Sequence, residues 1–301
     1  MCQDRTDDML ETHFTCKGKK YPVIGLTGGV GAGKSTVLNM LIGFMRPDSG
    51  EILLDGENMR NLDFRSFRRH LAVVPQETIL FSGTVRQNIT YGSADVTEEE
   101  LWQVLKAANL DEVVKNLPQG LDTNLGEHGG RLSGGQRQRI GIARALILHP
   151  EFVVCDEPVS ALDVSVQSQI INLLLDLKEK ENLSYLFIAH DIGVVRYISD
   201  RIGVMYLGYL FEECPTEELF RNPLHPYTKT LLSSVPVIDA SGAAKKERTL
   251  IQGELPSPLS PPSGCVFRTR CPYAKPICAE QCPEKKDVGG GHHVMCHLYD
   301  E

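Results

Sequence analysis

The sequence predicts an α/β fold in which helices cover a parallel sheet, with a helical subdomain and a small cysteine-rich C-terminal extension. Short apolar stretches typical of buried strands alternate with segments of helical spacing, and the pattern is mainly helical over about 82–147. Five of the nine cysteines lie from Cys265 onwards. We therefore expect a disordered or partly ordered N-terminus over 1–20, an α/β domain over 21–235 and a cysteine-rich extension over 236–301.

Strand, loop and helix follow one another at the start of the α/β domain. Residues 21–27 form an apolar strand candidate that runs into the glycine-rich stretch GGVGAGKS, and STVLNMLIGFM then has helical spacing. The stretch has the P-loop spacing G-x-x-x-x-G-K-[ST], in which glycines let backbone N–H groups turn towards phosphates. Lys34 would neutralise phosphate charge, and Ser35 would place its hydroxyl on Mg²⁺. A chance glycine-rich turn is the alternative. We expect the nucleotide to contact Gly28, Gly29, Val30, Gly31, Ala32, Gly33, Lys34, Ser35 and Thr36.

The later elements continue the alternation. Thr97 and Glu100 have the spacing of a capping box that opens the helical segment ELWQVLKAANLDEVVKNL, and a second helix is expected after Ser133. The remaining expected elements are a buried strand, a helix with one apolar face and another strand, over 151–156, 163–180 and 184–190.

The composition is that of a globular protein, with 42% apolar residues and a formal net charge of −8. This charge gives no long-range attraction for nucleic acid or anionic lipid, so we expect no nucleic-acid partner. No stretch reaches the roughly 18 uninterrupted apolar residues of a membrane helix, and the first residues are charged where a signal peptide would be apolar. We expect a cytoplasmic protein that meets a membrane only through a partner.

The segment LSGGQ at 132–136, followed by the second helix, resembles the signature sequence of ABC transporter ATPases. Its physical basis is a helix N-terminus, where unpaired N–H groups and the serine hydroxyl favour anionic oxygen. In that family the signature closes over ATP held by another subunit. The resemblance therefore implies a nucleotide contact from Ser133, Gly134, Gly135 and Gln136. A plain Ser-capped helix is the alternative.

An acidic pair at the end of the strand at 151–156 strengthens the resemblance. FVVCDE is similar to a Walker B strand, which implies that Asp156 holds Mg²⁺ and that Glu157 polarises the attacking water. The segment SALD, ending at Asp163, matches the D-loop of the family. Two solvated acids are the alternative.

Two further polar residues complete the resemblance. His190, in IAHD, matches the family's histidine that contacts the γ-phosphate, and Gln76, in VVPQ, matches the Q-loop glutamine that reaches Mg²⁺ and the water. The resemblance covers roughly 21–235 and implies a P-loop NTPase of the ABC ATPase type that uses ATP and Mg²⁺. It implies Mg²⁺ ligation by Ser35, Gln76 and Asp156, and catalysis by Glu157, His190, Gln76 and Lys34.

The partners follow from the same resemblance. It implies head-to-tail pairing with a second ABC ATPase subunit, identical or paralogous, around two MgATP. It further implies two integral membrane permease subunits, and a peripheral location on the cytoplasmic face of the cell membrane. The C-terminal half, with the segment NPLHPYTKTLLSSVP that contains HPYT, resembles the peptide importers, which implies an extracytoplasmic peptide-binding protein and a peptide cargo.

The resemblance is not of one kind along the chain. Residues 21–40 look most like the opening of a dephospho-CoA kinase, residues 41–149 like exporter-type ABC domains, and residues 150–301 like oligopeptide/dipeptide importer ATPases. ABC domains also begin with antiparallel strands and an aromatic residue that stacks on adenine. Here the only upstream aromatic candidates are His13, Phe14 and Tyr21, so we expect weakened adenine recognition.

The cysteines of the extension match a pattern of the importer family, whose members carry a 4Fe–4S cluster there. Soft thiolates suit iron–sulfur or zinc, and a segment so poor in apolar residues needs such a clamp. The implied ligands are Cys265, Cys271, Cys278 and Cys296. Cys282 is additional and could replace one ligand, and for zinc the alternatives are His292, His293 and His297.

The leading hypothesis is an ATP-hydrolysing subunit that powers peptide uptake. An exporter-type ATPase is one alternative, because the middle segment resembles exporters. A soluble kinase of the dephospho-CoA type is another, although no later segment supplies its acceptor-binding and lid elements. A non-catalytic ATP-binding module is disfavoured because Glu157 and His190 are both present.

Overall fold

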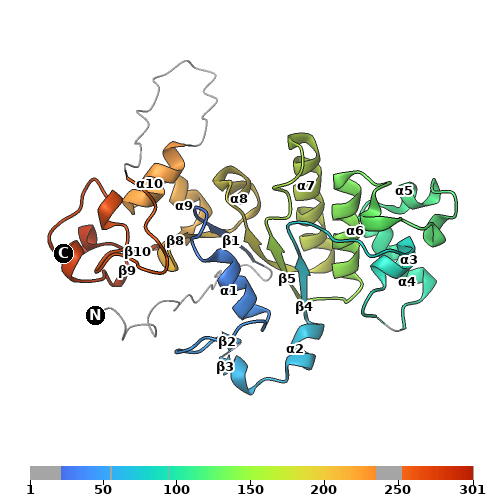
Figure 1. The fold of residues 1–301 in the computed structure, drawn as a ribbon, viewed down its shortest axis with the longest axis horizontal. Helices are drawn as coiled ribbons and strands as arrows, with labels where there is room; N and C mark the ends of the chain where they lie inside the picture. The colour runs from blue at the N-terminus through green and yellow to red at the C-terminus, as the bar shows by residue number, and fades with distance from the viewer. Residues whose placement is uncertain (1–21, 55, 94, 235–252, 301) are drawn as a thin grey trace, which may run out of the picture. The chain divides into compact units, whose positions relative to one another are not determined.

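A computed structural model of the chain describes residues 22–54, 56–93, 95–234 and 253–300 (Figure 1). The expected N-terminal segment, its aromatic candidates and the boundary near residue 236 lie outside these residues. The described chain divides into two compact units. The first unit combines 23–60 with 188–300, and the second spans 61–187 together with the residue before β1.

The first unit is built on a mixed sheet. Its strands lie in the order β1 (Val23–Thr27), β7 (Arg201–Tyr206), β8 (Tyr209–Pro215), β10 (His293–Met295) and β9 (Lys285–Asp287). β1 and β7 are parallel, whereas the pairs β7–β8, β8–β10 and β10–β9 are antiparallel. The sequence predicted a parallel sheet, and this unit adds to it an antiparallel part that was not predicted.

A tight turn explains the change of direction between β7 and β8. Leu207 and Gly208 both adopt positive φ angles, 46° and 85°, as a two-residue hairpin turn requires. Such a turn returns the chain antiparallel, where a parallel connection needs a crossover of a dozen residues or more.

The helices of the first unit are short, and Figure 1 shows α9 and α10 beside β8. The helix after the P-loop ends earlier than expected, because Gly43 adopts a left-handed φ of 74° and the Phe44 N–H turns back to the Asn39 carbonyl (2.8 Å). The elements are α1 (Lys34–Leu41), α8 (Ile192–Ile198), α9 (Thr216–Arg221), α10 (Pro226–Ser233), α11 (Ile277–Glu280), the strand pair β2 (Leu53–Leu54) and β3 (Glu57–Asn58), and short 3₁₀ turns at Met59–Asn61, Arg268–Arg270 and His297–Tyr299.

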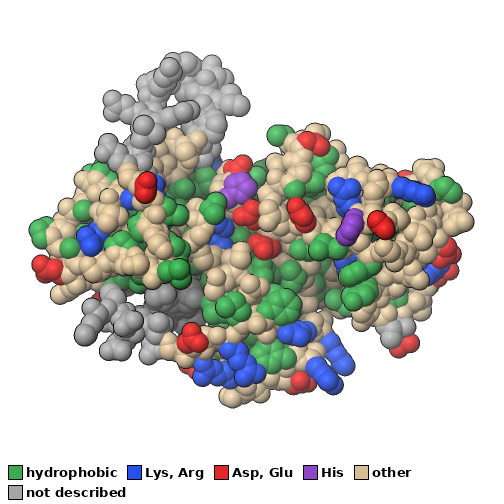
Figure 2. Space-filling view, viewed as in Figure 1, with side chains coloured by type: hydrophobic (Ala, Val, Ile, Leu, Met, Phe, Trp, Pro, Cys, Tyr) green, Lys and Arg blue, Asp and Glu red, His purple; other side chains and the backbone are tan. Residues whose placement is uncertain are grey.

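The second unit carries the expected strand over 151–156 and the helical segment. β5 (Phe152–Asp156) pairs in parallel with β4 (Leu71–Val74), and β6 (Ser184–Ile188) follows α7. The helices and 3₁₀ turns are α2 (Phe64–Arg69), α3 (Val85–Ile89), α4 (Glu98–Ala107), α5 (Asp111–Lys115), α6 (Gly134–Leu146), α7 (Val164–Glu181), Gly120–Asp122 and Glu127–Gly129. Figure 2 shows basic side chains gathered over α2, whose Arg65, Arg68 and Arg69 are exposed.

Local signals set the ends of these helices. The capping boxes at Thr97 and Ser133 are both present, with the side chain at the third helical position bonding back to the cap. The helical segment opened by Thr97 is broken into α4 and α5, because Asn109 lies between them in the left-handed region at φ 54°. None of the described helices is long and apolar enough to cross a membrane.

The cysteine-rich extension has more anchorage than its sequence suggested. β10 adds to the edge of β8, and Val266, Phe267 and Val294 are buried. Arg201, on β7, donates to the Glu213 carboxylate (2.8 Å) and to the Gly291 carbonyl (2.8 Å). The extension is therefore held by strand pairing, by buried apolar side chains and by a hydrogen bond from the buried Arg201.

Candidate functional site

The P-loop is shaped by contacts that only glycine permits. A Cβ on Gly28 would lie 2.1 Å from the Met205 carbonyl oxygen, on the neighbouring strand β7. The turn after β7 also supports the loop, because the Gly208 N–H donates to the Ala32 carbonyl (2.8 Å). Gly31 and Gly33 adopt positive φ angles of 75° and 97°. The strand, loop and helix expected from the sequence are thus confirmed and are braced by the β7–β8 hairpin.

Lys34 lies at the first position of α1 and is 8% exposed. Its ammonium donates to the carbonyls of Gly28 (2.8 Å) and Gly29 (3.1 Å), so the charge is held at the loop itself. Val30, Ser35 and the other loop residues at 29, 31 and 36 are exposed, which leaves the loop open to a ligand. The helix N-terminus and the lysine favour an anion at this position.

A tyrosine that sequence reasoning missed also contacts the P-loop. The Gly29 N–H donates to the Tyr227 hydroxyl at 2.8 Å. Tyr227 lies on α10, in the segment HPYT that suggested peptide transport. That segment is held by Glu212, whose carboxylate accepts from the N–H groups of Leu224 (2.7 Å) and His225 (2.9 Å). The signal in the sequence was the HPYT motif, but nothing local indicated its target.

The residue before His190 is hydrogen-bonded to β1, the strand that leads into the P-loop. The Ala189 N–H donates to the Leu26 carbonyl on β1 (3.2 Å), and His190 is exposed. Asp191 caps α8 through an oxygen that accepts from the Gly193 N–H (2.8 Å). Both His190 and the P-loop therefore belong to the first unit.

The acidic pair lies at the end of β5 in the second unit. Asp156 is the last strand residue, and Glu157 follows it with a left-handed φ of 47°, a conformation that is strained for glutamate. The Ser160 hydroxyl donates to the Glu157 carbonyl (3.0 Å), and the Gln76 amide donates to the Ser160 hydroxyl (3.2 Å). Gln76, the D-loop serine and the acidic pair are thus brought together.

The signature segment forms the start of α6, also in the second unit, where Ser133 is exposed and Gly135 is buried. The Ser133 hydroxyl accepts from the Gln136 N–H (3.2 Å), and the Gln136 side chain accepts from the Ser133 N–H (2.9 Å). The serine is therefore the helix cap within this chain. A Cβ on Gly135 would lie 2.6 Å from Val166 Cγ1, so glycine is required where α6 approaches α7.

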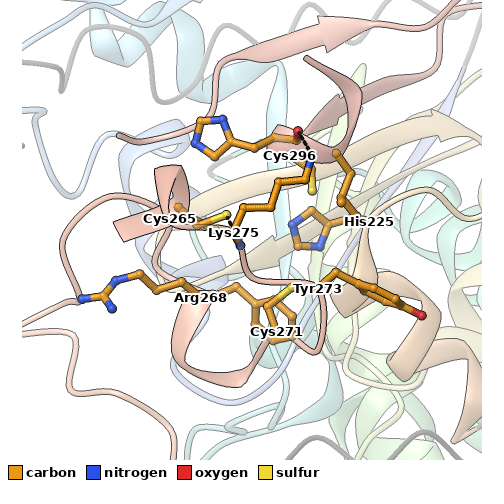
Figure 3. Close-up of a pocket in the computed structure, with 11 residues that line it drawn as sticks. His225, Cys265, Arg268, Cys271, Tyr273, Lys275 and Cys296 are labelled. Atoms are coloured by element: carbon orange, nitrogen blue, oxygen red, sulfur yellow. Dashed lines mark hydrogen bonds between the residues drawn. The ribbon is translucent and has the colours of Figure 1, made fainter. Parts of the chain in front are cut away.

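Four cysteines of the extension share one pocket (Figure 3). The pocket is lined by Cys265, Cys271, Cys278 and Cys296, together with the rings of His225 and Phe267. The Lys275 side chain reaches through this region, and its ammonium donates to the His297 carbonyl (3.4 Å). The pattern of four expected ligands therefore converges in space.

The backbone around the pocket provides a donor for each thiol. Burial raises the pKa of Cys265 to about 12 and that of Cys296 to about 11, so both are protonated as free thiols at neutral pH. The Lys275 N–H donates to the Cys278 sulfur (3.4 Å). The backbone N–H groups of Phe267, Tyr273 and Leu298 oppose the effect of burial by lowering the pKa of Cys265, Cys271 and Cys296, respectively. Such donors stabilise thiolates, so these residues fit a metal that displaces the protons.

The alternative metal ligands either lie outside the pocket or are engaged in other contacts. Cys282 is not among the residues that line the pocket. His292 is buried against Glu212 (2.8 Å), in a group with Cys214 whose ligand atoms lie within 4.8 Å of one another. That carboxylate already accepts two backbone N–H groups, as described above, so we interpret the group as a structural contact. His297 lines the pocket, but its ring nitrogens contact Asp300 (2.6 Å) and the Gln281 carbonyl (3.0 Å).

The structure thus assembles the expected residues in two sets. The first unit holds Gly28–Thr36, His190 and the four cysteines, and the second holds Gln76, Ser133–Gln136, Asp156 and Glu157.

Known protein families match two segments of the chain. Residues 12–160 match the family described as ABC transporter, and residues 211–278 match the family described as oligopeptide/dipeptide transporter, C-terminal region. A solved bacterial Atm1-family ABC exporter with ATP bound has a similar fold, with a TM-score of 0.63 and 34% identity. The match covers 70% of this chain and 36% of the exporter chain, so the exporter is much longer.

Curated relatives match over most of their length. The oligopeptide transport ATP-binding protein AppF of Bacillus subtilis (strain 168) is 47% identical, covering 93% of this chain and 87% of that protein. The oligopeptide transport ATP-binding protein OppF of Salmonella typhimurium (strain LT2) is 44% identical, covering 86% and 79%. These matches run through all three segments that resembled different families. The chain therefore belongs to the ABC transporter family, as an ATP-binding ATPase protein that carries the C-terminal region of the oligopeptide/dipeptide transporters.

Proposed function

We propose that this ATPase powers the uptake of oligopeptides or dipeptides from the cytoplasmic face of the cell membrane. The support is the names of the relatives, which specify oligopeptide transport, and the match of residues 211–278 to the peptide-transporter C-terminal region. The matches to transport proteins extend over most of the chain and argue against the kinase alternative.

The observation that carries the nucleotide assignment is the position of the Lys34 ammonium. It is held at the loop carbonyls while Val30, Gly31 and Ser35 remain exposed, an arrangement suited to phosphate binding. We assign β/γ-phosphate binding to Lys34 and Mg²⁺ ligation to Ser35, Gln76 and Asp156. MgATP would supply the phosphoryl group and the charge-neutralising cation, so the protein contributes positioning and electrostatics.

Glu157 is assigned to the attacking water and His190 to the γ-phosphate. The left-handed backbone of Glu157 supports a functional role, because such strain persists where the surroundings fix it. Gln76 is linked to the Glu157 backbone through the Ser160 hydroxyl. We assign it to sense the membrane subunit.

A second ABC ATPase subunit would complete each site. The signature, Ser133–Gln136, lies at the start of α6 and belongs in this proposal to the partner's nucleotide. The test is phosphate release by the purified chain over a range of protein concentrations, beside Glu157→Gln and Ser133→Arg variants, with Glu151→Gln as the control. Specific activity should rise with concentration and both variants should abolish it. Activity that is independent of concentration and survives Ser133→Arg would contradict the composite site.

Two permease subunits and an extracytoplasmic peptide-binding protein are proposed as further partners. An exposed apolar group near Gln76 supports permease docking: Ile79, Phe81 and Tyr91 are exposed, and the last two rings stack at 4.4 Å. Phe81→Asp should abolish co-purification with the permeases while unstimulated ATPase activity remains. Unchanged co-purification would place the docking surface elsewhere.

An iron–sulfur cluster is proposed for the four-cysteine pocket. The support is the convergence of the four thiols and the N–H donor given to each. The protein should be purified without oxygen and analysed for iron, acid-labile sulfide and zinc, beside Cys271→Ser and Cys282→Ser. Iron with sulfide that Cys271→Ser loses and Cys282→Ser keeps supports the proposal. Zinc without sulfide, or no metal at all, overturns it.

A further inference from the structure

One peptide unit of the P-loop joins Tyr227 to Lys34. The Gly29 N–H donates to the Tyr227 hydroxyl at 2.8 Å, and the Gly28 carbonyl of the same peptide accepts from the Lys34 ammonium at 2.8 Å. In a trans peptide these two groups point in opposite directions. The hydroxyl and the ammonium therefore hold the peptide from its two sides.

The plane of this peptide can turn easily about the backbone bonds on either side of it. It is flanked by two glycines, which have the widest choice of backbone angles of any residue. The Cβ position of Gly28 is closed by the Met205 carbonyl, but the N–H of Gly29 lies on the exposed part of the loop. A hydrogen bond from outside the loop is what fixes the direction of this N–H, and with it the carbonyl that faces the lysine.

Tyr227 is well placed to supply that bond. Its side chain is buried, and the centre of its ring lies 4.8 Å from that of Tyr206 and 5.5 Å from that of Phe267. Its own N–H donates to His225 Nδ1 at 3.0 Å. Burial raises the pKa of Tyr227, so its hydroxyl stays neutral at physiological pH. The oxygen that accepts from the P-loop is thus held by packing and by a helix cap.

We propose that Tyr227 is a positioning residue for ATP binding, which acts through the 28–29 peptide to hold the Lys34 ammonium where the phosphates bind. Hydrogen bonds in such a chain polarise one another, so the bond from the tyrosine strengthens the carbonyl as an acceptor for the lysine. The inference rests on the proposed role of Lys34. It gives the peptide-transporter C-terminal region a direct part in nucleotide binding.

The test compares Tyr227 with Tyr206, a second buried tyrosine whose ring packs against it. Tyr206 is also buried, and within the described part of the chain its hydroxyl has no hydrogen-bond partner, so Tyr206→Phe is the matched control for Tyr227→Phe. Binding of MgATP should be measured by calorimetry in the full chain. Tyr227→Phe should weaken it about two- to tenfold, the usual effect of one hydrogen bond, and Tyr206→Phe should leave it unchanged. Equal affinities in the two variants overturn the inference.

Two further measurements separate this inference from its premise. Lys34→Met should abolish MgATP binding, and if it does not, the assigned role of Lys34 fails whatever Tyr227 does. If Lys34→Met abolishes binding while Tyr227→Phe matches Tyr206→Phe, only the inference fails. The rate at which acetic anhydride modifies Lys34 is a direct readout. It should rise in Tyr227→Phe and not in Tyr206→Phe, at equal thermal stability, and an unchanged rate counts against the inference even if the variant is less stable.

Discussion

Gln76 donates a side-chain hydrogen bond to Ser160, with the amide nitrogen 3.2 Å from the hydroxyl oxygen. Gln76 follows β4 and Ser160 follows β5, and these strands are parallel neighbours, so both residues leave the sheet at the same edge. Ser160 then donates to the Glu157 carbonyl. A residue of the Q-loop is therefore linked through one hydroxyl to the backbone of the proposed catalytic glutamate.

This link predicts non-additive effects on ATP hydrolysis. Ser160→Ala should lower kcat about two- to tenfold in the wild-type background and have a smaller effect in Gln76→Ala, where the bond to Gln76 is already lost and only the bond to the Glu157 carbonyl remains to be broken. The measurement is a double-mutant cycle on kcat. Ser168→Ala on α7 is the control, since its hydroxyl donates only to the local Val164 carbonyl. Additive losses for Gln76 and Ser160 would rule out the coupling.

The close approach of Gly28 to β7 predicts a severe effect of one methyl group. Gly28→Ala would place a Cβ 2.1 Å from the Met205 carbonyl, so the loop or the strand must shift, and MgATP binding should be lost with about 1–3 kcal/mol of stability. Gly56→Ala is the control, because Gly56 also has a positive φ (85°) but its Cβ would meet nothing within 4 Å. Calorimetry and thermal unfolding provide the readouts. Wild-type affinity in Gly28→Ala would refute the requirement.

The contact between α6 and α7 predicts a rescue. Gly135→Ala would bring a Cβ to 2.6 Å from Val166 Cγ1 and displace the signature, so ATPase activity should be lost while the chain's own P-loop still binds MgATP. Adding Val166→Ala removes the obstructing methyl and should restore most of the activity. Gly130→Ala, whose Cβ would lie 3.7 Å from the Glu127 carbonyl, should have little effect. Failure of the rescue would mean that the glycine serves something other than this contact.

The buried carboxylate of Glu213, on the strand β8 that pairs with the extension, predicts a large loss of stability when it is neutralised. Glu213 is 1% exposed and pairs with Arg201 (2.8 Å) and Lys285 (3.2 Å), so Glu213→Gln leaves buried positive charge uncompensated and should cost about 3–5 kcal/mol. Glu217→Gln, which breaks an exposed pair with Arg196 (3.4 Å), should cost less than about 1 kcal/mol. Urea unfolding of both variants is the measurement. Equal losses would show that the buried pair is not what anchors the extension.

Local patterns predicted the parts of the site that are contiguous in the chain. The strand before Gly28, the helix after it and the caps at Thr97 and Ser133 follow from apolar periodicity and from short-range hydrogen bonds. The same patterns misjudged the end of α1 and missed the break at Asn109, because both depend on single residues that adopt left-handed backbone angles. Periodicity over a window does not detect such single positions.

The pairing of the sheet was predicted only in part. β5 was expected as a buried parallel strand, but its partner β4 was not predicted, and neither was the antiparallel addition of β10 and β9 to β8. Strands of three residues carry little periodic signal of their own. Their register is fixed by the partner edge and by the ion pairs of Glu213, which lie far away in the chain.

The sequence by itself determined the chemistry of this protein: the phosphate loop, the acidic pair, the signature and the four cysteines, because each is a fixed spacing of residue types. Only the tertiary structure decided that Tyr227 holds the N–H of Gly29 across 198 positions of the chain, and that the four thiols meet in one pocket. The physical reason is that such contacts depend on strand register and packing among distant segments. No local spacing encodes these, because their energy is gained only when the whole unit has folded.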